Sequence, residues 1–272
     1  MKGFLTFLLC LPLGACGGAP PLLHGSQVLP EGVVRGTAGF AAEFSSNPLA
    51  SAVASAREAA SEPSSSASSP DRTAILTKGV LSEAALSPGL GPVFSLRVGL
   101  GSDWEAGATY GGQTLRIDGR RSFSLGSKSG LSLSGGVAGR VPIRLDSESN
   151  IPSLDLKSLR GVGFDVPLLL GWESAGGLYR AWFGGRGGWA EYRLTTSTSE
   201  PKQYPLFPQA LSLSASQWFV GPLVGFAVGF TNIHFALELE VDYQVIEGRA
   251  NGVTGQVHGL SFAPSSGLWF TL

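Results

Sequence analysis

Cysteine is nearly missing from this chain. Of 272 residues two are cysteines, Cys10 and Cys16, and none follows residue 16. The body of the chain therefore has no internal disulfide and no thiolate metal site. It also lacks a Walker loop, a cluster of His, Asp and Glu, and a nucleotide motif. The sequence predicts no metal site and no cofactor.

Charged residues are also scarce in this chain. Charged residues make up 14% of the chain, against about 25% in ordinary soluble domains. The formal net charge is −1, so we expect no nucleic-acid partner. Glycine is abundant, with 39 residues. This composition suits a membrane protein, but it also allows a glycine-rich soluble all-β protein.

The first residues of the chain form a targeting signal and not a part of the fold. Lys2 precedes an apolar run from Phe4 to Leu13, which is too short to span a bilayer as a helix and suits a signal peptide. The run ends in Leu-Gly-Ala followed by Cys16, which resembles the bacterial lipobox. That resemblance implies that residues 1–15 are removed and that the thiol of Cys16 takes a lipid. Gly17 replaces the Asp that often retains such proteins in the inner membrane, which favours the outer membrane. An ordinary secretory signal, with Cys16 incidental, is the alternative.

Two segments of the chain, 16–32 and 45–90, are expected to lie outside the strands of the fold. Residues 16–32 are rich in Gly and Pro and read as a flexible tether. A long outer loop is expected over 45–90, with helix-like stretches at 48–60 and 72–87. Between them, 61–70 is a low-complexity Ser-rich segment that we expect to be disordered.

The rest of the chain alternates apolar and polar residues. In 233–245, apolar side chains take every second position, and Glu238, Glu240 and Asp242 share the opposite face. Alternation over that length exceeds a soluble strand of about 5–6 residues and suits a membrane-barrel strand of about 9–11. A transmembrane helix at 218–230 is disfavoured by its length and by Pro222.

The pattern predicts a closed antiparallel transmembrane β-barrel at 33–272. Ten strands are expected, at approximately 33–44, 91–101, 104–118, 120–126, 130–142, 161–173, 177–194, 212–230, 232–247 and 256–272. Eight remain possible if 33–44 lies outside the sheet and 104–126 forms fewer strands. Short connections such as 102–103 alternate with long ones such as 143–160, and only 118–120 departs from this rule. An even strand number with alternating turn lengths is typical of outer-membrane barrels.

Aromatic residues near the strand ends predict two membrane-interface girdles. Trp218 and Phe230 are separated vertically by roughly 30 Å at a rise of about 3.3 Å and a tilt of about 40°, which leaves room for an apolar band of about 25 Å. The proposed girdle residues are Trp104, Trp172, Tyr179, Tyr192, Trp218 and Phe230.

The end of the chain resembles the C-terminal assembly signal of outer-membrane barrels. Ser265, Gly267, Phe270 and Leu272 match that signal, although Phe is the commoner final residue. The chain is therefore similar to the small bacterial outer-membrane β-barrel family. The resemblance implies that the protein lies in the outer membrane of a Gram-negative bacterium. It also implies outer-membrane lipids, the barrel-assembly machinery and the lipoprotein-processing enzymes as partners.

Charged residues of both signs are directed inward by this register. Such a lumen can form a network of ion pairs that closes the barrel, although a narrow wet channel stays possible. The proposed network consists of Arg97, Glu105, Arg116, Asp118, Arg140, Asp165, Glu173, Arg180, Arg186, Glu238, Glu240 and Asp242.

No catalytic constellation accompanies the three histidines. His258 has Ser261 and Glu247 nearby in sequence, but no nucleophile motif surrounds it. We therefore expect a structural, binding or narrow-transport barrel and not an enzyme. A soluble lipid-anchored β-sandwich or lipocalin-like binder is the main alternative, and a barrel hydrolase is the third.

Overall fold

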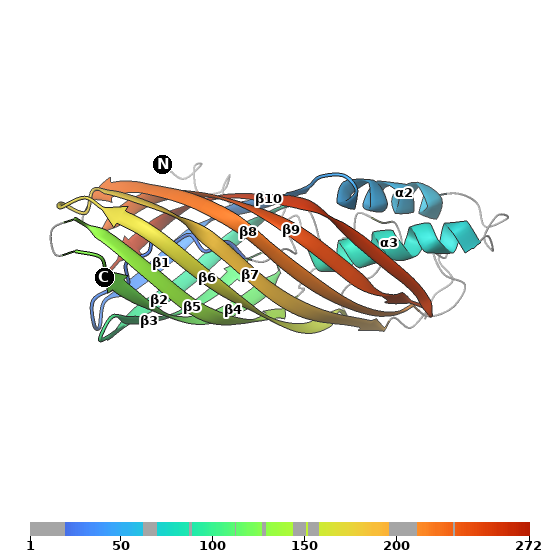
Figure 1. Cartoon of the computed structure of the whole chain (residues 1–272), viewed down its shortest axis with the longest axis horizontal. Coiled ribbons are helices and arrows are strands. Elements are labelled where there is room, and N and C mark those ends of the chain that lie inside the picture. Colours follow the sequence, from blue (N-terminus) through green and yellow to red (C-terminus); the bar gives the residue numbers. More distant parts are fainter. Residues whose placement is uncertain are drawn as a thin grey trace, which may run out of the picture.

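The computed structural model describes residues 20–61, 70–86, 89–111, 113–126, 129–143, 151, 158–195, 211–230 and 232–272. The predicted signal peptide, Cys16 and residues 62–69 lie outside these ranges. Ten strands form one closed barrel, in which each strand pairs with its neighbours in the sequence and β1 pairs with β10 (Figure 1). The strands are β1 (Val34–Ser45), β2 (Gly89–Gly101), β3 (Trp104–Gly111), β4 (Thr114–Ser124), β5 (Leu131–Pro142), β6 (Arg160–Glu173), β7 (Tyr179–Thr195), β8 (Ser212–Phe230), β9 (Ile233–Ala250) and β10 (Val253–Thr271).

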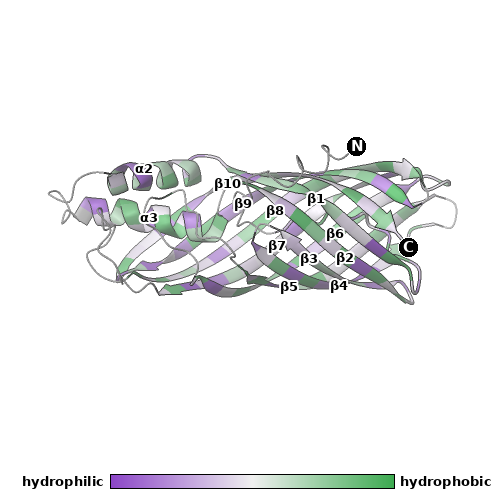
Figure 2. Ribbon diagram, turned by 180° about the vertical axis from the view of Figure 1, so that it is seen from behind, coloured by the Kyte–Doolittle hydropathy of each residue, from purple (hydrophilic) through white to green (hydrophobic). Residues whose placement is uncertain are grey.

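Alternation along each strand separates an outer apolar face from an inner mixed face. In β8, Val220 and Val224 are exposed on the outside, whereas Phe219 and Leu223 are buried inside. Hydrophobic and hydrophilic residues alternate along the strands over much of the barrel (Figure 2). A soluble lipocalin-like barrel would need a polar outside, so that alternative is wrong for this chain. The outer face has the character of a lipid-facing surface.

The predicted turn at 118–120 is wrong. β3 ends at Gly111 and β4 begins at Thr114, and Gln113 in the connection has a φ of +59°. β9 and β10 are likewise joined by a two-residue turn, Asn251 and Gly252, instead of the predicted loop over 248–255. Positive φ at both central residues is what a tight hairpin requires.

The two ends of the barrel differ. At one end, which we call the short-turn end, the connections include 102–103 and 174–178. At the other end, the long-loop end, β1–β2, β5–β6 and β7–β8 are joined by connections over 46–88, 143–159 and 196–211. The predicted asymmetry therefore holds for these three connections, whereas the β3–β4 and β9–β10 turns are short.

Two helices extend the barrel at the long-loop end, as the sequence predicted. They are α2 (Leu49–Ser61) and α3 (Pro70–Leu86), which pack against each other beyond the strands (Figure 1). α3 also contacts β8, β9 and β10. Its residues Val80 and Leu81 are fully buried. The expectation that all of 45–90 lies on the surface is therefore wrong for α3. Neither helix has the length and apolar character needed to cross a bilayer.

Candidate functional site

The lumen holds the first described part of the chain. We call residues 20–33 the luminal segment. Leu22, Leu23, His24 and Leu29 in it are buried inside the barrel. The sequence predicted a flexible tether over 16–32, and for the described residues this is wrong. The segment forms no helix or strand. Inward-facing side chains of the barrel bond several of its backbone groups, and Gly32 and Val33 bond the backbone of Gly99.

Carboxylates of the wall accept hydrogen bonds from backbone amides of the luminal segment. The amides of Leu22 and Leu23 donate to Oε1 of Glu238, at 2.9 and 3.1 Å. The amide of Leu29 donates to Oε2 of Glu105 at 2.8 Å. The two carboxylates lie on β9 and β3, so the segment bridges distant parts of the wall.

Arginines of the wall bind the carbonyl groups of the same segment. Arg120 donates to the carbonyl oxygens of Gly25 and Gln27, and Arg186 donates to that of Pro20 at 2.8 Å. Burial, followed by the positive charge of Arg120, lowers the pKa of His24 well below its usual range.

Glycines in the wall make room for the segment. A Cβ at Gly99 would lie 2.0 Å from the carbonyl oxygen of Pro30, and one at Gly171 would lie 2.3 Å from Oγ of Ser26. Both positions exclude any larger residue unless the segment moves.

One chain of ion pairs crosses the lumen from β3 to β6. Glu105 pairs with Arg97 and with Arg120, the latter at 3.0 Å. Arg97 also pairs with Asp118, which pairs with Arg116 at 2.6 Å. Arg116 in turn binds Asp165 at 2.9 Å. All six side chains are almost completely buried, and each charge is offset by at least one opposite charge.

A second ion pair joins β7 to β9. Arg186 binds both oxygens of Glu240, at 2.7 and 2.5 Å, in the bidentate geometry typical of strong arginine–carboxylate pairs. Beside it, Glu238 accepts a hydrogen bond from Nε1 of Trp182 at 2.9 Å.

The structure buries most of the twelve predicted network residues, but it does not pair them all. Ten are buried inside the barrel, whereas Glu173 and Arg180 pair at 3.3 Å near the short-turn end and are partly exposed. Arg140, Glu238 and Asp242 form no ion pair with another described residue.

Sequence reasoning missed four buried charges, of which Arg35, Glu43 and Arg120 lie on strands and Glu83 lies on α3. The sequence predicts a strand that begins at Arg120 after a connection at 118–120, whereas β4 runs through these residues and directs Arg120 inward. Arg35 and Glu43 lie on β1, where they share one face with Thr37 and Ala41. The inward-facing residues of β1 recur at every second position, and this alternation could have identified Arg35 and Glu43.

Neutral polar residues form the next layer toward the long-loop end. The hydroxyl of Tyr192 donates to Gln217 at 2.7 Å, Gln217 donates to Gln244 at 2.9 Å, and Gln244 donates to Ser261 at 2.9 Å. Tyr192 is therefore not a girdle residue, and that prediction is wrong. It lies on the same face of β7 as Arg186, so the register that directs Arg186 inward does the same for Tyr192.

Above this layer the lumen is apolar. Buried residues of α3 join inward-facing residues of β7 to β10 in one hydrophobic cluster, which includes Leu81, Leu194, Leu213, Ile246 and Val257. α3 therefore covers the lumen at the long-loop end.

The other five predicted girdle residues, Trp104, Trp172, Tyr179, Trp218 and Phe230, are exposed on the outside. Trp218 also contacts Trp189 of β7, with ring centroids 6.2 Å apart. At the short-turn end an aromatic group lies inside instead. Trp182 stacks on Trp269 at 5.7 Å, and Arg35 lies over the Trp269 ring at 4.7 Å.

The residues of the C-terminal signal alternate across the wall. Ser265 and Gly267 face inward, and Phe270 and Leu272 are exposed outside. Their role in assembly stays a prediction.

The histidines do not assemble a catalytic site. His258 is exposed on the outer face of β10, whereas Ser261 is buried on the inner face. His234 is buried at the short-turn end and bonds the carbonyl group of Gly177 at 2.7 Å. Within the described ranges no group of three or more His, Cys, Asp and Glu is arranged to hold a metal ion.

Comparison with known proteins gave structural likeness alone. The sequence matches no protein-family model. It also matches no curated protein. Among solved structures, Neisserial surface protein A shares 11% identity over 88% of this chain and 95% of its own, with a TM-score of 0.35. A major outer membrane protein from Thermus thermophilus shares 13% over 88% and 99%, with a TM-score of 0.32. The attachment invasion locus protein Ail of Yersinia pestis shares 11% over 89% and 99%, with a TM-score of 0.25. At such low scores the description of this chain as a closed ten-stranded barrel rests on its own strand pairing and its apolar outer face.

Proposed function

We propose that this chain is an outer-membrane β-barrel of a Gram-negative bacterium whose lumen is closed, and that it serves a structural or binding role. The observation that carries the proposal is the luminal segment, held inside the barrel by Glu105, Arg120, Arg186 and Glu238. A general porin needs a water-filled channel, whereas this lumen contains its own polypeptide, paired charges and a helix at its mouth.

The membrane part of the proposal is supported by the outer face. Valine, leucine or phenylalanine side chains are exposed there on each strand from β6 to β9, together with Trp172 near the end of β6 and Trp218 on β8. Soluble proteins rarely expose so large an apolar surface to water. Lipids of the outer membrane are therefore the first partner that we propose.

A lipid anchor at Cys16 belongs to the same proposal. Only three residues lie between Cys16 and Pro20, so the two are separated by at most about 14 Å of extended chain. Pro20 lies beside Gly111 at the end of β3. An acyl chain on Cys16 is thus expected to reach the bilayer near the β3–β4 turn.

Planar-bilayer recording on the purified protein tests the closed lumen. We expect no steady conductance, because the luminal segment, the ion pairs and the apolar contacts of α3 occupy the interior. A steady conductance in the range of a general porin would contradict the proposal.

A variant shows whether the luminal contacts cause the closure. Glu238→Ala with Glu240→Ala removes the carboxylates that hold the amides of Leu22 and Leu23 and the guanidinium of Arg186. We expect brief openings in this variant. Glu191→Ala, at an exposed position, is the matched control and should remain silent.

A further inference from the structure

Arg140 is a buried cation that the ion-pair network leaves out. Its residue is 5% exposed, and it forms no ion pair with another described residue. Its Nε and Nη2 atoms have no hydrogen-bond partner. The nearby carboxylate of Asp165 is already held by three hydrogen bonds from Arg116. The carboxylates of Asp165 and Glu43 act on Arg140 only from beyond ion-pair distance. A buried guanidinium that contacts no carboxylate is destabilising, so we expect a contacting partner from outside the fold.

The free donors of Arg140 lie on one edge of its guanidinium. Nε and Nη2 point in the same direction and can donate two parallel hydrogen bonds to a carboxylate or phosphate. The flat face of the group lies over the ring of Phe219, with 4.5 Å between Cζ and the ring centroid. A Cβ at Gly163 would lie 2.8 Å from Nε, so a glycine there keeps space for the side chain.

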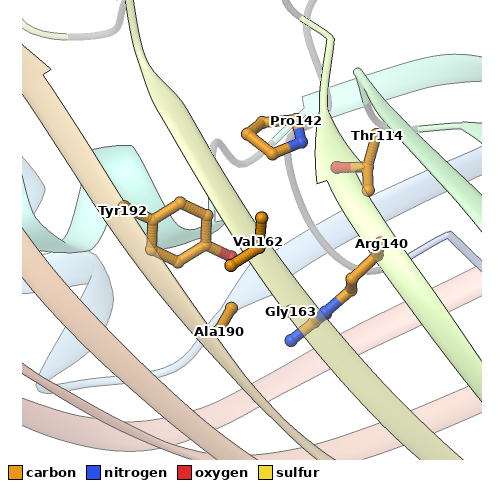
Figure 3. A pocket seen from close by; sticks show the side chains of 7 residues that line it. All are labelled: Thr114, Arg140, Pro142, Val162, Gly163, Ala190 and Tyr192. Carbon is orange, nitrogen blue, oxygen red and sulfur yellow. The ribbon is translucent and has the colours of Figure 1, made fainter.

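A small cavity lies beside this arginine. Residues of β4 to β7 line it, among them Thr114, Pro142, Val162 and Tyr192 (Figure 3). Its volume of about 10 Å³ suits one water molecule or the terminal oxygens of a larger group. The hydroxyl of Thr114 points toward it (Figure 3). The polar side chains at the cavity are therefore the guanidinium of Arg140 and the hydroxyls of Thr114 and Tyr192, of which the Tyr192 hydroxyl donates to Gln217, and no carboxylate is among the lining residues.

The cavity lies where the pairing between β5 and β6 ends. The last pair between β5 and β6 is Arg140 with Gly163, whereas β6 continues to Arg160 with β7 as its partner. Pro142 has no amide to extend the ladder. On the outside, Val162 and Phe164 are exposed apolar residues. The cavity can therefore be reached from the lipid-facing side.

We propose that Arg140 and Thr114 bind the oxyanion head of an amphipathic molecule of the carboxylate or phosphate class. One of its oxygens occupies the cavity, which has room for about one water-sized group, and the rest of the head lies at the mouth of the cavity. Its apolar part lies outside along Val162 and Phe164. This site is independent of the closed lumen, since it opens through the wall.

Binding of decanoate to the purified protein in detergent micelles tests the proposal, by isothermal titration calorimetry or native mass spectrometry. Decanol and inorganic phosphate are the comparison probes. We expect decanoate to bind more tightly than decanol. Arg140→Gln should weaken decanoate binding roughly tenfold or more, because two charge-assisted hydrogen bonds are lost. Arg193→Gln, at an exposed position of β7, is the control and should bind as the wild type does.

Thr114→Val keeps the proposal testable if Arg140→Gln does not fold, as judged by heat-modified mobility in electrophoresis. It retains the shape of the side chain and should weaken decanoate binding less than Arg140→Gln. Phosphate binding that depends on Arg140 while decanoate does not bind would assign the site to a free anion, within the same chemistry. Equal binding of decanoate and decanol, or binding of neither probe to the folded wild type, would overturn the proposal and leave a water molecule in the cavity.

Discussion

Replacing Glu105 by Gln tests whether the luminal charges hold the fold together. The side chain is fully buried and accepts hydrogen bonds from Arg97, Arg120 and the amide of Leu29. Glutamine has almost the same shape, so the substitution removes the charge and one acceptor without opening a cavity.

The expected cost follows from the partners left behind. Arg97 keeps Asp118, but Arg120 retains only carbonyl oxygens and loses its single carboxylate. Breaking a buried ion pair by removing one partner costs about 3–5 kcal/mol of the free energy of unfolding. The Gln amide adds to the cost, because its donor hydrogens face those of Arg120 and Leu29.

Urea unfolding in detergent micelles, followed by tryptophan fluorescence, measures this cost. Glu191→Gln is the matched control, because its ion pair with Arg193 is exposed and spans 4.0 Å. That control should change the free energy of unfolding by at most about 0.5 kcal/mol. If Glu105→Gln unfolds at the same urea concentration as the wild type, the network does not stabilise the barrel and our reasoning fails.

Three further predictions concern other parts of the molecule. Cys16→Ser should abolish metabolic labelling with a fatty acid but leave the protein in the outer-membrane fraction; its release into the soluble periplasm would disprove the barrel as an independent anchor. Gly225→Leu should destabilise the barrel by at least about 2 kcal/mol in the same urea assay, because a Cβ there would lie 2.1 Å from Trp182. Gly119→Ala, which would meet nothing within 4 Å, should be nearly neutral. Protease added to whole cells should cut between Ser61 and Pro70 and spare the buried half of α3; cutting only after permeabilisation would reverse the orientation.

The long strands could be predicted because their alternation is uninterrupted. β8 was placed at 212–230, the same bounds as in the structure, and β9 was placed within three residues of both its ends. The same rule failed at the β3–β4 turn. Arg120 and Arg121 beside Gly119 suggest a turn, whereas the actual connection lies at 112–113. Gly111 and Gly112 form a glycine pair of the kind that marks a tight hairpin, and Asn251 with Gly252 marks the β9–β10 turn in the same way, so both turns had a signal in the sequence.

The luminal segment could not be predicted from local sequence. Its amides at Leu29 and Leu22 bond side chains that lie 76 and 216 residues further along the chain. Such contacts leave no periodicity in the segment itself, which reads as a tether because it is rich in Gly and Pro. The inward charges were visible, but their partners were not, since an inward arginine can bind a carboxylate or a carbonyl group equally well.

The closure of the lumen that we propose does not depend on any one of its layers. Near the short-turn end, Trp182 and Trp269 fill the interior, and the luminal segment with its ion pairs fills the middle. At the long-loop end, α3 packs against Leu213 and Ile246 through apolar contacts. These layers come from different parts of the chain and use different forces. Loss of Glu238 and Glu240 weakens the middle layer and also removes the acceptor of the Trp182 indole, but it leaves the α3 layer in place, because the apolar contacts of the helix do not depend on these carboxylates. A continuous water path requires that α3 also moves, and for this reason we expect brief openings in that variant and not the steady current of a porin.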